Sequence, residues 1–169
     1  MELIENTEFE TINNISSIHA ARKVMGTADC FICEADLYIS DLSIFDAELS
    51  RSCYYGKMVP GFSDDWVFDW DGERITRVGK EGTDRYNMVG VSYFKKADAA
   101  VIRDAIDAAY EKPGYEGLYW DEIVDRQLDK LNLDIHPVEK EQIVEIDSVA
   151  ELAVIDESYR EVLEKMQAE

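Results

Sequence analysis

The sequence predicts an α/β fold in which a block of antiparallel strands is inserted between helices. A short apolar run at residues 29–33 comes directly after a segment with helical spacing. Such a run is typical of a buried strand in an α/β protein. Residues 54–94 change to a period of two, which indicates antiparallel strands. Helical spacing of apolar residues returns at 97–111. This succession excludes a helical bundle and a β-sandwich.

The N-terminal part predicts a helix, a strand and a second helix. Residues 13–26 have helical spacing, and Gly26 ends the pattern. The residues that could cap this helix are Asn13, Asn14 and Ser16. The run Asp-Cys-Phe-Ile-Cys at 29–33 has the composition of a buried central strand. A short amphipathic helix is expected at 41–51.

The middle of the chain predicts short strands separated by turns. Pro60-Gly61 and Asp71-Gly72 are turn signals, and Asp-Gly between two strands is typical of a hairpin. The strand candidates are 54–59, 66–69, 74–78 and 88–94. The helix predicted next, at 97–111, places its apolar residues on one face.

The last third of the chain predicts two helices and two strands. Helices at 118–131 and 148–166 flank short strands at 133–138 and 142–146. The whole pattern opens with a helix that should cross over from an earlier strand, and no earlier strand is predicted. We therefore expect residues 1–169 to form a single α/β domain whose N-terminal βαβ portion is missing or supplied elsewhere.

The strongly negative charge of the chain indicates which kinds of partner it does not bind. It has 37 acidic and 17 basic side chains, a net charge of −20 and a pI near 4.3. Binding to a phosphate backbone requires Lys and Arg, so the charge argues against nucleic acid and anionic membrane surfaces as partners. No run of about 18 apolar residues occurs, so no membrane insertion is expected. We expect a cytoplasmic protein, because three cysteines in a chain of this length form no disulfide framework.

The cysteine and histidine residues predict no site. Cys30 and Cys33 match a C-x-x-C motif, but residues i and i+3 of a strand point to opposite faces, which favours buried thiols over a metal or redox pair. His19 and His136 lie far apart in the sequence and belong to no catalytic motif.

Three carboxylates predict a metal site. Asp36 follows the strand predicted at 29–33, where open α/β sheets place ligand groups. Glu145 and Asp147 are two residues apart, so an extended chain would put both on one face. Paired carboxylate oxygens suit Mg²⁺. The alternative is that Asp147 or Ser148 only caps the last helix.

Aromatic residues next to acids predict a site for a cationic group. An aromatic box with a carboxylate binds a quaternary ammonium group through cation–π attraction and charge. The alternative is ordinary packing in the core. The aromatic residues are Trp66, Trp70, Tyr93, Phe94, Tyr119 and Trp120, and the neighbouring acids are Asp65 and Asp121.

Six segments in this order resemble the phosphocholine cytidylyltransferase family, small bacterial relatives of the sugar-phosphate nucleotidyltransferases. The resemblance covers residues 6–165. The segments are Asn13-Asn14-Ile-Ser-Ser-Ile-His-Ala-Ala-Arg, Glu34-Ala35-Asp36, Asp65-Trp66, Gly90-Val-Ser-Tyr-Phe94, Leu118-Tyr-Trp-Asp121 and Glu145-Ile-Asp-Ser148.

The resemblance implies a Rossmann-like nucleotidyltransferase fold and a reaction of CTP with phosphocholine, or a related phosphorylated alcohol, to give CDP-choline and pyrophosphate. It implies that Mg²⁺ is held by Asp36, Glu145 and Asp147, with Asp36 and Asp147 as the catalytic residues. The residues that it places on the choline side are Trp66, Tyr119, Trp120 and Asp121. Glu34 stands where the family has the first aspartate of Asp-Ala-Asp.

One departure from the family leaves other functions open. The Gly-rich loop with Arg and Lys that cradles the triphosphate does not occur in residues 1–169. Without it, the chain could bind choline or phosphocholine with no chemistry. It could also be a protein-interaction module, because an exposed sheet edge tends to pair with a partner chain or with a second copy.

Overall fold

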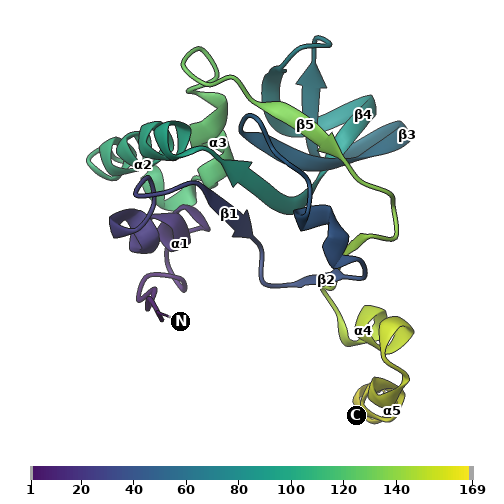
Figure 1. Ribbon diagram of the computed structural model, residues 1–169. Coiled ribbons are helices and arrows are strands. Elements are labelled where there is room, and N and C mark those ends of the chain that lie inside the picture. The colour runs from purple at the N-terminus through teal and green to yellow at the C-terminus, as the bar shows by residue number, and fades with distance from the viewer. Residues whose placement is uncertain (1, 168–169) are drawn as a thin grey trace.

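The computed structural model describes residues 2–167 and contains two antiparallel-rich sheets (Figure 1). The larger sheet has the strand order β1-β4-β3-β5, and the smaller one pairs β2 with β6. The strands are β1 (Cys30–Cys33), β2 (Leu37–Ile39), β3 (Cys53–Trp70), β4 (Ile75–Phe94), β5 (Asp134–Pro137) and β6 (Ile143–Glu145). The helices are α1 (Ile15–Ala20), α2 (Lys96–Tyr110), α3 (Trp120–Asp125), α4 (Val149–Ile155) and α5 (Arg160–Gln167).

The strands predicted at 54–59, 66–69, 74–78 and 88–94 merge into one long hairpin of β3 and β4. The expected turn at Pro60-Gly61 is a bulge inside β3, where Gly61 has a φ of +83° and the register with β4 shifts. Val67 pairs with both Gly79 and Asn87, so the outer part of the hairpin curls back on itself. The Asp71-Gly72 turn joins the two strands as expected.

Strand β1 forms as expected, but its place in the sheet was wrongly predicted. It pairs antiparallel with β4 and lies at the edge of the larger sheet rather than in its centre, as far as residues 2–167 are concerned. Its residues alternate between half-buried and exposed, with Phe31 among the exposed ones. Association of this edge with a partner chain stays a prediction.

The helices differ in how closely they follow the sequence pattern. Helix α2 fits the prediction and buries Ile102 and Ile106. The helix expected at 118–131 ends at Asp125, and the turns that follow still bury Leu128 and Leu131. The helix expected at 148–166 is broken into α4 and α5. In place of the helix expected at 41–51 only a 3-10 turn at Leu42–Phe45 forms.

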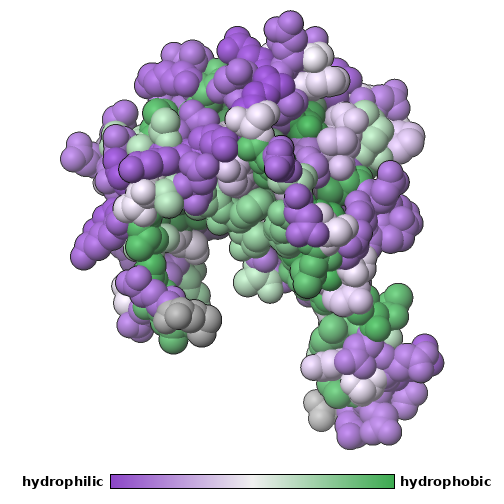
Figure 2. Space-filling model, in the orientation of Figure 1, coloured by the Kyte–Doolittle hydropathy of each residue, from purple (hydrophilic) through white to green (hydrophobic). Residues whose placement is uncertain are grey.

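The larger core lies between the four-stranded sheet and α1, α2 and α3, which gather at one end of the molecule (Figure 1). A smaller core joins the other face of the sheet to β2 and β6. Helices α4 and α5 form an arm that points away from the body, and apolar residues gather on the arm and along the adjoining edge of the body (Figure 2). Among residues 2–167, no helix has the length and apolar character needed to cross a membrane.

Candidate functional site

A cavity of about 470 Å³ lies where the end of β1, the smaller sheet and the start of α3 meet. We call it the acid pocket, because carboxylates dominate its charged lining. The sequence-predicted residues that line it are Asp36, Trp66, Tyr119, Trp120, Asp121 and Glu145. Glu34 and Asp65 line it as well, whereas Asp147 does not. The fold therefore brings together groups that are more than 100 residues apart in the sequence.

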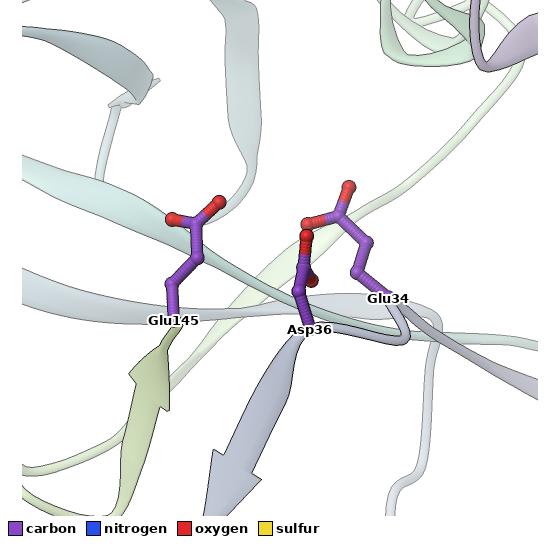
Figure 3. A group of neighbouring side chains, drawn as sticks. All are labelled: Glu34, Asp36 and Glu145. Carbon is purple, nitrogen blue, oxygen red and sulfur yellow. The ribbon is translucent and has the colours of Figure 1, made fainter. Parts of the chain in front are cut away.

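Three carboxylates, Glu34, Asp36 and Glu145, form the rim of the acid pocket (Figure 3). One oxygen from each lies within 4.8 Å of the others. Their positions follow from the pairing of β2 with β6, which sets Leu37 opposite Glu145. The Ile146 N–H donates to the Asp36 carbonyl at 2.9 Å and fixes the two segments side by side.

Gly90 allows Glu34 to take its place in this rim. Gly90 has a φ of +74°, a conformation that favours glycine. A Cβ atom at this position would lie 2.7 Å from Glu34 Oε2. The Gly90 carbonyl also accepts a hydrogen bond from the Glu34 N–H at 2.9 Å. Both the backbone and the side chain of Glu34 are thus positioned by β4.

The rim is electrostatically frustrated. Burial raises the pKa of Glu34, and the charges of Asp36 and Glu145 raise it further. The pKa of Glu145 is raised by burial, then by Asp147 and Asp36, and the charge of Lys57 opposes this rise only in part. Within residues 2–167 no Lys or Arg forms an ion pair with the three rim carboxylates. Closely spaced oxygen ligands without a cationic partner could hold a hard divalent ion.

Asp147 lies outside the group of three rim carboxylates. Its backbone N–H donates to the Glu151 carboxylate at 3.0 Å, and the Ser148 hydroxyl caps α4 by accepting from the Glu151 N–H at 3.2 Å. The capping alternative therefore applies to Ser148. Glu34 was not singled out as a ligand from the sequence, although the spacing of two residues between Glu34 and Asp36 is the same signal that suggested Glu145 and Asp147.

Trp120 and Asp121 form the floor of the acid pocket, and the buried Tyr54 contacts both. Trp120 is 4% exposed and packs against Tyr54 and Phe94, so it belongs to the larger core. Its backbone N–H donates to Asn14 Oδ1 at 3.0 Å. This contact ties α3 to the start of α1.

Asp121 is 2% exposed, and its Oδ1 accepts a hydrogen bond from the Tyr54 hydroxyl at 2.9 Å. Burial raises the pKa of Asp121 to about 7, with a further contribution from the charge of Glu34. Tyr54 was not predicted from the sequence as part of the site, because its partner lies 67 residues away. A carboxyl group with this pKa gains a proton or a cation at low cost near neutral pH.

Trp66 and Tyr119 form an aromatic wall at the side of the acid pocket. Their rings meet edge to face with centroids 5.3 Å apart, and both are half-buried. Trp66 comes from β3, and Tyr119 immediately precedes α3, where its N–H donates to the Glu122 carboxylate at 2.8 Å. Of the six aromatic residues expected beside acids, Trp66 and Tyr119 make a wall and Trp120 is largely buried. Trp70, Tyr93 and Phe94 do not line the acid pocket.

The fold is the one found in nucleotidyltransferases. It superposes on the CTP:phosphocholine cytidylyltransferase of Streptococcus pneumoniae with a TM-score of 0.78 at 24% identity, over 92% of this chain and 67% of the other. The inositol-1-phosphate CTP transferase of T. maritima gives a TM-score of 0.60 at 17% identity, over 92% and 62% of the two chains. These likenesses confirm the Rossmann-like nucleotidyltransferase fold predicted from the sequence.

Sequence comparison narrows the relationship to cytidylyltransferases. The chain is 51% identical over 158 residues to the 2-aminoethylphosphonate cytidylyltransferase of Lancefieldella rimae, which covers 93% of this chain and 64% of that protein. It is 25% identical to the choline-phosphate cytidylyltransferase of Streptococcus pneumoniae, over 93% of this chain and 68% of that protein. No family model matches. The chain is thus a homologue of bacterial cytidylyltransferases that spans about two thirds of their length.

Proposed function

We propose that this chain is the acceptor-binding and metal-binding part of a cytidylyltransferase that uses CTP and 2-aminoethylphosphonate. The observation that carries the proposal is the acid pocket, in which the rim carboxylates lie beside an aromatic wall and a buried aspartate. The 51% identity to a 2-aminoethylphosphonate cytidylyltransferase supports this acceptor over phosphocholine. An oxygen of the phosphonate would attack the α-phosphorus of CTP, and the bond to the pyrophosphate leaving group would break.

The rim carboxylates Glu34, Asp36 and Glu145 fit a magnesium ion. Their oxygens lie close together, and no cationic side chain of residues 2–167 is paired with them. When bound, Mg²⁺ supplies positive charge that neutralises the phosphates. We assign Glu34 to this group in place of Asp147, which lies outside it. No general base is required, because a phosphonate oxygen is already an anionic nucleophile.

The cationic end of the acceptor would lie toward the aromatic wall and the pocket floor. A primary ammonium group donates three hydrogen bonds, and the accessible carboxylates of Glu34 and Asp65 line the acid pocket. A trimethylammonium group donates none and depends on aromatic faces. Because Trp120 is 4% exposed, only Trp66 and Tyr119 offer ring surface of any extent. This balance supports the primary amine as the acceptor.

The test is pyrophosphate release by the 169-residue chain with CTP, Mg²⁺ and either 2-aminoethylphosphonate or phosphocholine. We expect both acceptors to bind, 2-aminoethylphosphonate more tightly, and pyrophosphate release to occur only if residues 1–169 also hold the triphosphate of CTP. Asp36→Asn should abolish that release, whereas Asp147→Asn should reduce it far less. Binding of the acceptor is measured in parallel by calorimetry. Acceptor binding without release would identify a binding module, and neither binding nor release would overturn the proposal.

A further inference from the structure

Two cavities that differ in charge share the aromatic wall. On one side lies the acid pocket, and on the other a second cavity of about 590 Å³. We call it the basic hollow, because its three basic residues, Arg77, Lys80 and Arg126, outnumber its two acids, Glu122 and Asp125. Trp66 and Tyr119 line both cavities, whereas Lys80 lines only the basic hollow. Both rings therefore have a cationic side and an acidic side.

Lys80 is the cation that contacts this wall. It pairs with Trp66 across the hairpin of β3 and β4. Its Nζ lies 5.8 Å from the centroid of the Trp66 ring and 5.2 Å from that of Tyr119. These distances are typical of cation–π interactions. Among the ion pairs of residues 2–167, none involves Lys80, so its charge is directed at the two rings.

Arg77 has a different role in the basic hollow. Its guanidinium donates to Asp69 at 2.9 Å and to the carbonyl groups of Lys80 and Glu81 at 3.2 and 2.8 Å. These bonds hold the curled end of the hairpin, and with it the backbone of Lys80. Arg77 therefore positions Lys80 and is itself engaged.

We propose that Lys80 determines acceptor specificity by opposing trimethylammonium groups at the aromatic wall. The inference rests on the proposed function, because it requires the acid pocket to bind the cationic end of an acceptor. The Lys80 ammonium interacts with the negative π-faces of both rings. A second cation on the other side of the same rings meets weakened attraction and direct charge repulsion.

Trimethylammonium and primary ammonium groups differ in how much binding energy the charge of Lys80 removes. A trimethylammonium group relies on the rings, so the charge of Lys80 removes much of its binding energy. A primary ammonium group donates hydrogen bonds to carboxylates such as Glu34 and Asp65, and depends less on the wall. Lys80 therefore favours primary amines.

The experiment compares two ligands that differ only in the methyl groups on nitrogen, phosphoethanolamine and phosphocholine. Their dissociation constants are measured by calorimetry for the wild-type chain, Lys80→Met, Lys80→Arg and Lys112→Met. We expect the wild type to prefer phosphoethanolamine, and Lys80→Met to shift the ratio of the two constants toward phosphocholine by about fivefold. Lys80→Arg should keep the preference, because it retains the charge.

Lys112→Met is the matched control. It removes the same charge from the groove between α2 and α3, which is lined by neither Trp66 nor Tyr119. It should leave the ratio unchanged, and circular dichroism checks that each variant is folded. An unchanged ratio in Lys80→Met, with both ligands bound, overturns the role of Lys80 and leaves the proposed function in place. If the wild type binds neither ligand, the proposed acceptor site fails and this inference fails with it.

Discussion

The floor and the rim of the acid pocket are built in opposite ways. In the floor, Trp120, Asp121 and the adjoining Tyr54 are each at most 4% exposed. Core packing and hydrogen bonds within the chain hold them in place. The rim carboxylates lie on the connection between β1 and β2 and at the end of β6, and repel one another. The fold holds both parts in place, but the repulsion among the rim carboxylates is left for a bound cation to relieve.

Substitutions in the floor should therefore act on stability first. Trp120→Ala removes a large buried side chain that packs against Tyr54 and Phe94. We expect the free energy of unfolding to fall by about 3–5 kcal/mol. Urea unfolding measures this, and a loss below about 1 kcal/mol would show that the cavity collapses and that Trp120 is not part of the core.

Because Trp120→Ala should destabilise the fold, it is a poor variant for testing ligand binding by the aromatic residues. A loss of ligand binding in Trp120→Ala would report unfolding as much as recognition. Tyr119 is half-buried and contacts Trp66 and Lys80, so Tyr119→Ala removes a wall residue without opening the larger core. It is the better variant for measuring the aromatic contribution to acceptor binding.

Asp121 makes the stability of the floor depend on pH. Its folded pKa of about 7 lies above the ordinary value of 3.8, so between these two values the folded state holds a proton that the unfolded state has lost. This contribution to stability is fully present below pH 3.8 and is lost as the pH rises to about 7. Relative to Asp121→Asn, the wild type should lose roughly 4 kcal/mol across that window.

The measurement is the free energy of unfolding of both proteins at several pH values, in EDTA so that no divalent ion contributes. The difference between the two proteins isolates Asp121 from the other carboxylates. It should grow as the pH rises from 4 to 7 and then level off. A difference that does not change with pH would mean that Asp121 is ionised throughout the range.

The sequence predicted those parts of the fold that depend on local patterns. Helix α2 and strand β1 followed from the spacing of their apolar residues. The position of β1 at the sheet edge did not, because an apolar run indicates burial and not the identity of neighbours. The hairpin was divided into short strands because Gly61 has the residue type of a turn, although here it forms a bulge inside β3.

The candidate site was predictable to a similar degree. Asp36 follows β1, and Glu145 ends β6, so strand boundaries were enough to single them out. Asp147 is two residues from Glu145, as Asp36 is from Glu34. The chain begins α4 directly after it, with Ser148 as the N-cap, so Asp147 lies outside the rim. Tyr54 depends on a contact with α3 that only the folded chain provides.

The smallest expected effect is that of Glu34→Gln on stability. It is a sharp test of the rim, because the sign of the effect should depend on Mg²⁺. In EDTA, Glu34→Gln removes one of three charges whose oxygens lie within 4.8 Å of one another. We expect this variant to be more stable than the wild type by about 1 kcal/mol, because repulsion is relieved. In Mg²⁺ the wild type should gain stability by binding the ion, while Glu34→Gln should gain much less. The order of stability should therefore reverse.

The control is Asp147→Asn, which removes a nearby charge outside the rim. It should change stability only slightly in EDTA and should leave the gain from Mg²⁺ almost intact. Thermal unfolding with and without Mg²⁺ measures both quantities for all three proteins. If Asp147→Asn loses the gain and Glu34→Gln keeps it, the ligands are those expected from sequence spacing, and Glu34 is a bystander. If all three gain equally, the ion binds elsewhere, and the rim carboxylates serve the cationic end of the acceptor instead.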